Sequence, residues 1–147
     1  GITPPLVKEG CKHVYYLQTF KFNKEIIGIH RNTFVDALRA ELPTMVLREN
    51  SPIIGCGFAA PLYLQPLYQQ RLNQCSFNCP RYEGNVSYEK GICPVTERMF
   101  YDEVFTHEFM RPSFSKADLE DVVNAYQKVY ENVNELKEYE SKNSVKV

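Results

Sequence analysis

SKADLEDVVNAYQKVYENVNEL, from Ser115 to Leu136, is the stretch with the most regular hydrophobic pattern in the chain. Its apolar residues recur at spacings of three and four, as on one face of a helix; they are Leu119, Val122, Val123, Tyr126, Val129, Tyr130, Val133 and Leu136. Ser115 is followed three positions later by Asp118, which has the form of a capping box. The pattern predicts one long helix that begins after Ser115 and lays this stripe on a core.

Two shorter helices are predicted upstream. Asn32 or Thr33 can cap a helix that runs to about Leu42, because apolar residues recur at helical spacing and Pro43 ends the run. Pro94 suits the first position of a second helix, PVTERMFYDEV, which extends over residues 94–104. Together with the C-terminal stretch, these segments give about three helices.

The strand signals are shorter. HVYYLQTFKF, residues 13–22, is rich in β-branched and aromatic residues and predicts a strand with both faces partly covered. Residues 44–47 and 104–109 are further short candidates, whereas residues 1–12 lack periodicity and are interpreted as an entry segment. The chain is therefore predicted to be a single α+β domain over residues 1–147. Residues 71–93 are expected to form a flexible loop, and residues 140–147 a frayed tail.

Composition excludes several classes of protein. The 147 residues carry 17 basic and 18 acidic side chains, so nucleic-acid binding and electrostatic membrane binding are not supported. No run approaches the roughly twenty apolar residues that a membrane-spanning helix needs. The five cysteines are odd in number and too sparse for a disulfide scaffold, which favours a reducing, cytoplasmic location.

The segment GCGFAAPLYLQPLYQQ, from Gly55 to Gln70, is the strongest candidate for a ligand site. It combines glycines, prolines and aromatic residues without one charged side chain. Such a segment presents backbone amides and tyrosine hydroxyls beside apolar surface, which suits a small polar ligand. Phe58, Tyr63 and Tyr68 fit a core equally well, because a buried tyrosine hydroxyl needs a partner that either the protein or a ligand can supply.

Metal binding and nucleophilic catalysis have weaker support. Structural zinc needs four ligands, usually in two short-spaced pairs. The chain offers one such pair with further thiols and a histidine; these are Cys75, Cys79, Cys93, Cys11 and His13. No metal site is therefore predicted, and a zinc domain remains the least favoured alternative. No histidine lies in a triad-like or zincin-like context. A partly buried histidine at a strand end is the preferred interpretation of His107.

Five segments, in order, resemble the C-terminal small domain of the DegT/StrS group of sugar and cyclitol aminotransferases, which are fold-type I pyridoxal-phosphate enzymes. These segments are HVYYLQTFKF, RNTFVDALRAEL, PLYLQPLY, CPVTERMFYDEV and DLEDVVNAYQKVYENVNEL. The resemblance covers most of the chain. It implies a small antiparallel sheet packed against about three helices, and an activity that aminates a keto-sugar or keto-cyclitol.

The resemblance also implies which residues face the substrate. Gly57 and Phe58 align with a His-Tyr pair of most family members, and Tyr63 replaces a histidine. This version is similar to the scyllo-inosose and aminohydroxybenzoate branch. The implied substrate contacts are, first, Tyr63, Gln65 and Phe58 and, second, His13, Tyr15 and His107.

The cofactor-binding half of such an enzyme is not expected in this chain. Family members hold pyridoxal phosphate through a lysine in a serine- or threonine-rich context of the large N-terminal domain. The lysines here stand in unlike surroundings; they include Lys8, Lys12, Lys21, Lys24 and Lys90. The chain is thus expected to be about the last third of a homodimeric enzyme, with its own N-terminal domain as partner. Alone it should lack catalytic residues, bound cofactor and activity. The alternative is a stand-alone binding or regulatory module with the same fold.

Overall fold

The computed structural model describes residues 1–42, 53–70, 84, 86–109 and 111–143. These residues form an α+β structure around a four-stranded antiparallel sheet of order β1-β2-β4-β3. The strands are β1 (Ile2–Thr3), β2 (Gln18–Phe22), β3 (Ile54–Cys56) and β4 (Val104–His107). In the register, His107 of β4 lies opposite Gln18 of β2 on one side and Ile54 of β3 on the other. The predicted fold class and the antiparallel sheet are confirmed.

The described residues contain more helices than the three expected. They are α1 (Lys24–Ile27), α2 (Arg31–Glu41), α3 (Pro66–Gln69), α4 (Pro94–Arg98), α5 (Lys116–Glu131) and α6 (Val133–Asn143), with a 3₁₀ turn η1 (Leu62–Leu64) and a π-helical turn η2 (Met99–Glu103). The predicted C-terminal helix is divided in two at Asn132, whose side-chain amide donates to the Lys128 carbonyl at 2.8 Å. The second predicted helix, over residues 94–104, is helical from Pro94 to Glu103, but it changes from α4 to the π-helical turn η2 at Met99.

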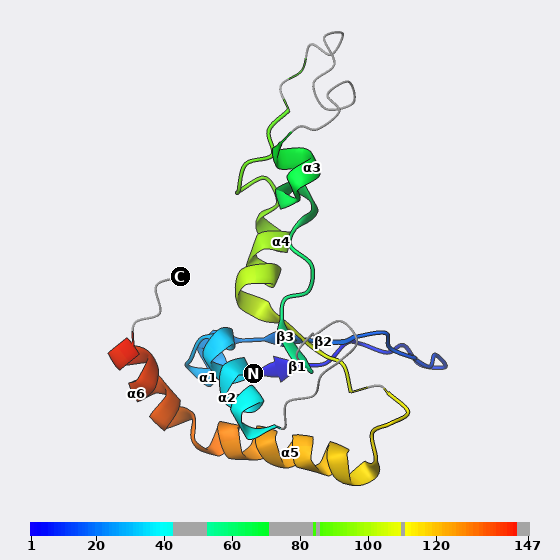
Figure 1. Ribbon diagram of the computed structural model, residues 1–147, viewed down its shortest axis with the longest axis vertical. Coiled ribbons are helices and arrows are strands. Elements are labelled where there is room, and N and C mark those ends of the chain that lie inside the picture. The colour runs from blue at the N-terminus through cyan, green and yellow to red at the C-terminus, as the bar shows by residue number, and fades with distance from the viewer. Residues whose placement is uncertain (43–52, 71–83, 85, 110, 144–147) are drawn as a thin grey trace.

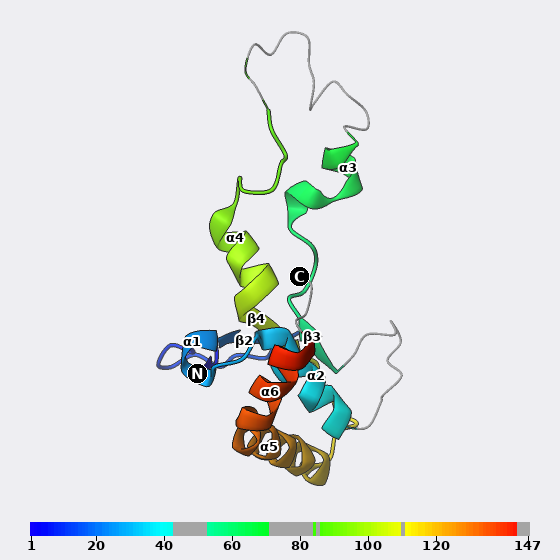
Figure 2. The same cartoon turned by 90° about the vertical axis from the view of Figure 1, so that its left-hand side faces the viewer.

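The core lies on one face of the sheet, between the strands and the helices α2 and α5 (Figures 1 and 2). Phe22 and Phe105 of the sheet meet Phe34 of α2, with ring centroids of Phe22 and Phe34 5.3 Å apart. Buried apolar residues of α5 and α6 complete the core; they are Ala125, Val129 and Val133. This aromatic and aliphatic cluster fixes the body of the molecule, defined as the sheet with α1, α2, α5 and α6.

The strand predictions are corrected in extent. Only Gln18–Phe22 of the predicted strand over residues 13–22 is extended. Phe22 is buried and Phe20 packs against the core, whereas Thr19 and Lys21 are exposed, so one face of β2 is open rather than both being covered. The N-terminal segment is not merely an entry, because Ile2 and Thr3 pair with β2. The strand predicted over residues 104–109 is confirmed as β4, which ends at His107.

The helix caps follow from local hydrogen bonds. His30, rather than Asn32 or Thr33, caps α2, and its Nδ1 accepts from the Asn32 amide at 3.2 Å. Ser115 and Asp118 form the predicted capping box of α5, in which the Ser115 amide donates to Asp118 Oδ2 at 2.7 Å. The predicted stripe is only partly buried. Three of its members are exposed and belong to the solvent face; these are Leu119, Val123 and Tyr130.

Several expectations fall wholly or partly outside the described residues. The candidate strand over residues 44–47 lies there, as does most of the predicted loop over residues 71–93. The predicted tail over residues 140–147 is helical as far as Asn143, because α6 continues to that residue. None of the helices described is long and apolar enough to cross a membrane.

An arm projects from the body beyond the end of β3 (Figures 1 and 2). We define the arm as residues 57–70 and 86–98, which include η1, α3 and α4. It begins at Gly57, whose φ of 65° is readily adopted only by glycine and whose amide donates to the Val104 carbonyl at 2.8 Å. A Cβ at this position would lie 2.8 Å from the Phe100 ring, so the arm meets the body too closely for a side chain.

Candidate functional site

A buried tyrosine–glutamate pair joins the two halves of the arm. Tyr63 lies in η1 and is 6% exposed, and Glu97 lies in α4 and is 8% exposed. The Tyr63 hydroxyl donates a hydrogen bond to Glu97 Oε1. The same oxygen accepts from the amides of Gly91, at 2.7 Å, and Cys93, at 3.3 Å. One carboxylate therefore holds η1 against the chain that leads into α4.

The electrostatics of this pair keep the proton on the tyrosine. The hydrogen bond from Tyr63 lowers the pKa of Glu97, with the amides of Gly91 and Cys93 adding to the effect. Burial, followed by the hydrogen bond to Glu97, raises the pKa of Tyr63. At neutral pH Glu97 is thus an anion and Tyr63 a neutral donor. The partner that a buried tyrosine hydroxyl requires is supplied here by the chain itself.

The other two arm residues of the prediction lie in different environments. Gln65 is half-buried, and its side-chain amide donates to the Ala60 carbonyl at 3.2 Å. Phe58 is 66% exposed and directly follows the glycine at the base of the arm. A ring this exposed is available to contact another surface. Whether Tyr63, Gln65 and Phe58 contact a substrate remains a prediction.

His107 lies inside the body rather than on the arm. It is 5% exposed, its Nε2 is hydrogen-bonded to the Tyr126 hydroxyl, and its ring lies 4.6 Å from that of Phe20. Burial lowers the pKa of His107 to about 4, so the imidazole is neutral at physiological pH. Burial likewise raises the pKa of Tyr126. The pair links β4 to α5 across the core.

His13 and Tyr15 lie in the segment between β1 and β2. Their rings stack with centroids 3.8 Å apart and an interplanar angle of 14°, and the Tyr15 amide donates to His13 Nδ1 at 3.0 Å. Tyr15 has a φ of 28°, a left-handed conformation that is uncommon for a tyrosine. The six predicted substrate residues thus occupy three places, namely the arm, the core and this segment. The isolated chain does not bring them into one site.

Arg31 is a buried charge that sequence reasoning missed. It is 3% exposed, and its guanidinium donates to the carbonyls of Phe100 at 2.7 Å, Tyr101 at 2.7 Å and Val104 at 2.6 Å. Burial lowers the pKa of Arg31. These acceptors lie in and just after η2, so Arg31 holds the turn that connects the arm to β4. An arginine near a predicted helix start is usually exposed to solvent. No pattern in the neighbouring sequence indicates the carbonyl groups that Arg31 binds.

Glu97 was missed as well, although a signal for it existed. It lies in the first turn after Pro94, three residues into a predicted helix. A carboxylate there is favoured by the helix dipole, and near a buried tyrosine it is a natural acceptor. The sequence alone gave no reason to pair it with Tyr63, because 34 positions separate the two residues.

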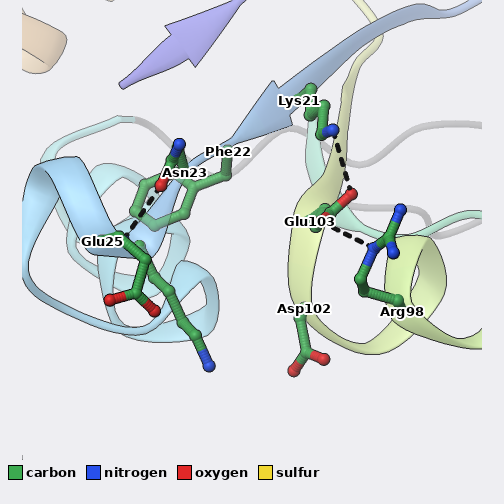
Figure 3. A pocket seen from close by; sticks show the side chains of 8 residues that line it. Lys21, Phe22, Asn23, Glu25, Arg98, Asp102 and Glu103 are labelled. Atoms are coloured by element: carbon green, nitrogen blue, oxygen red, sulfur yellow. Dashed lines mark hydrogen bonds and ion pairs between the residues drawn. The ribbon is translucent and has the colours of Figure 1, made fainter.

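A charged cleft opens where β2 and α1 face η2 (Figure 3). Its volume is about 340 Å³. The charged side chains that line it are Lys21, Lys24, Glu25, Arg98, Asp102 and Glu103. Glu103 lies between two cations, with Arg98 Nε 2.9 Å from one oxygen and Lys21 Nζ 3.5 Å from the other. None of the six residues predicted from the sequence lines this cleft.

The described residues do not fit a pyridoxal-phosphate site. The lysine of such a site is activated by desolvation or by a neighbouring cation, whereas every described lysine is exposed. No reaction step through this cofactor is therefore assigned to these residues. Among the described residues no group of three His, Cys, Asp or Glu side chains could hold a metal ion. Cys75 and Cys79, on which the zinc alternative depends, lie outside the described residues.

Searches for similar proteins found no match among protein-family models, curated proteins or solved structures.

Proposed function

We propose that this chain is the substrate-side small domain of a pyridoxal-phosphate aminotransferase that aminates a keto-sugar or keto-cyclitol. The proposal rests on the ordered resemblance of five segments to the DegT/StrS group. One geometric observation supports it: two of those segments, residues 61–68 and 93–104, meet through the hydrogen bond between Tyr63 and Glu97. Motifs that are separate in the sequence therefore form one projecting structural unit.

The exposed surface of the arm is consistent with a larger protein in which another domain covers it. Its exposed apolar side chains are Phe58, Leu62, Leu67, Ile92 and Val95. Exposed apolar side chains on a projection can form a surface that packs on another protein. In the proposal, the occupant is the cofactor-binding domain of the same enzyme. The substrate would lie between that domain and the arm.

Within that cleft the residues of this chain would bind and orient rather than react. The cofactor, held by the other domain, supplies the electron sink for amino transfer. The exposed ring of Phe58 would form an apolar wall, and the Gln65 amide could turn from its contact with Ala60 to a substrate hydroxyl. Because the Tyr63 hydroxyl donates its hydrogen bond to Glu97, it would accept a hydrogen bond from the substrate. Alternatively, Tyr63 would affect substrate binding indirectly, because its bond to Glu97 fixes the shape of the arm.

A labelling experiment on the 147-residue chain tests where the cofactor is bound. The chain is incubated with pyridoxal phosphate, reduced with borohydride and digested for mass spectrometry. We expect only scattered, substoichiometric labelling, because the described lysines are all exposed. One lysine labelled stoichiometrically would contradict the proposal. Labelling of a lysine outside residues 1–147, in a protein encoded by the complete gene, would support it.

The substrate role is tested by variants in that longer protein. Phe58→Ala and Gln65→Ala should each lower kcat/KM for a keto-cyclitol at least about tenfold, because the first removes the apolar wall and the second removes a partner of a substrate hydroxyl. Leu119→Ala, on the solvent face of α5, serves as the control and should leave kcat/KM unchanged. Full activity of both arm variants would remove them from the site. A complete gene that encodes no cofactor domain would instead favour a stand-alone binding module.

A further inference from the structure

We propose that the charged cleft binds a small zwitterion of the α-amino-acid class. This inference is independent of the aminotransferase proposal, because the cleft lies apart from Tyr63, Gln65 and Phe58 and involves no cofactor. Its volume of about 340 Å³ lies at the lower end of the range for small-molecule sites. It is therefore large enough for an amino acid and too small for an extended polymer.

The charges that line the cleft balance. Three cationic side chains face three anionic ones; they are Lys21, Lys24 and Arg98 against Glu25, Asp102 and Glu103. A site for a simple anion or a simple cation would carry an excess of the opposite charge. A balanced lining suits a ligand that carries both charges, with a carboxylate at one end and an ammonium group at the other.

The cations have unused capacity to bind a carboxylate. Arg98 uses Nε for Glu103, and its two terminal nitrogens make no hydrogen bond within the described part of the chain. Those two nitrogens form the fork that binds a carboxylate in a bidentate manner. Lys24, on the opposite wall, forms no ion pair with any described residue. The carboxylate of the ligand is thus assigned to Arg98, with Lys24 adding charge.

The anions provide the complementary end. Asp102 is 3.4 Å from the His30 ring, its side chain is 42% exposed, and Glu25 forms no ion pair among the described residues. Figure 3 shows Asp102 directed away from the Arg98–Glu103 pair. An ammonium group placed there would gain charge-assisted hydrogen bonds. Glu103 Oε2 is in addition a buried acceptor that forms an ion pair with Lys21 but no hydrogen bond to any described residue.

The backbone that carries the acidic residues of the cleft has an uncommon conformation. Asp102 and Glu103 lie in the π-helical turn η2, and single π turns occur frequently at functional sites. The buried guanidinium of Arg31 holds this turn through the carbonyls of Phe100 and Tyr101. The turn therefore presents its two carboxylates from a fixed backbone, which is what a small-ligand site requires.

Titration of the ¹⁵N-labelled chain followed by NMR tests the proposal. L-Alanine and L-glutamine are the probes, with L-lactate and isopropylammonium as matched compounds that each lack one of the two charges. We expect saturable shifts at amides of residues 21–25 and 98–103 with the amino acids only. No saturable shift, or equal affinity for lactate or isopropylammonium, would overturn the proposal.

Variants assign the two ends of the ligand. Arg98→Gln and Asp102→Asn should each weaken amino-acid binding at least about tenfold, as expected for loss of a charge-assisted hydrogen bond. The side chains of Arg98 and Asp102 are 55% and 42% exposed, so the fold should survive, and the dispersion of the NMR spectrum checks this. Arg111→Gln, which breaks an exposed ion pair with Glu108 outside the cleft, is the control and should bind normally. Unchanged affinity in both cleft variants would contradict the assignment.

Discussion

The body and the arm of this molecule are held together by different interactions. In the body, apolar rings such as Phe34 and Phe105 are completely buried. In the arm, Leu62 is 69% exposed while the buried contact is the polar pair of Tyr63 and Glu97. Hydrophobic burial therefore stabilises the body, whereas a few directional hydrogen bonds order the arm. A region that keeps its apolar side chains outward is suited to meeting another surface rather than to standing alone.

The junction between the two regions depends on Arg31. It projects from the start of α2, a body helix, and its donors satisfy carbonyls of η2 at the base of the arm. A π-helical turn shifts the usual backbone hydrogen bonds, so such carbonyls need another donor. The buried cation couples the arm to the body at the point where Gly57 and Phe100 make their close approach.

The largest predicted effect contrasts one core residue with one arm residue. Phe34→Ala removes a fully buried ring and should lower the free energy of unfolding by about 3–5 kcal/mol. Leu62→Ala, on the exposed surface of the arm, should change it by less than about 0.5 kcal/mol. Urea denaturation of both variants measures the contrast. Equal losses would mean that the arm contributes to the same apolar core.

Replacement of the junction cation should be nearly as costly. Arg31→Met leaves three carbonyls without their donor and should destabilise the protein by about 3 kcal/mol, measured by thermal and urea unfolding. Arg31→Lys should recover only part of this loss, since an ammonium group lacks the planar fork. The control is Arg111→Met, at an exposed ion pair, which should have little effect. Full stability of Arg31→Met would show that water can replace the guanidinium as the donor to these three carbonyls.

The buried histidine of the body, His107, should make the free energy of unfolding depend on pH. The pKa of His107 is about 4 in the folded state against 6.5 as its ordinary value, so the unfolded state binds more protons between these limits. Stability should thus fall as the pH drops from 6.5 to 4, by up to about 3 kcal/mol. Unfolding free energies measured across this window check the slope. His107→Gln should remove most of it and leave only the contribution of Glu97 near the acid end, and an unchanged slope in that variant would assign the proton to another group.

The sequence predicted the body better than the arm, for physical reasons. The capping box of Ser115 and Asp118 and the helical spacing after it are local signals, so the start of α5 was correct. The break at Asn132 was missed because the apolar spacing continues across it. Strand β1 was missed because a two-residue strand has no period and its pairing to β2 is non-local.

The candidate site was predicted only in part. Tyr63 was identified from its uncharged, proline-flanked surroundings, and it is the buried centre of the arm. Its partner Glu97 and the buried Arg31 were not predicted, because the contacts of each depend on chain segments far away in the sequence. The charged cleft was not predicted for the same reason, since residues 21–25 and 98–103 meet only in the folded chain.

Hydrogen exchange in Glu97→Ala is the most direct test of the claim that a polar pair orders the arm independently of the body. The substitution removes the acceptor of the Gly91 and Cys93 amides and of the Tyr63 hydroxyl. Both amides should then exchange at least about tenfold faster, while amides of β4 keep their wild-type rates. Glu120→Ala, on the exposed face of α5, should change neither set. Unchanged exchange at Gly91 and Cys93, or equal acceleration in β4, would contradict the account.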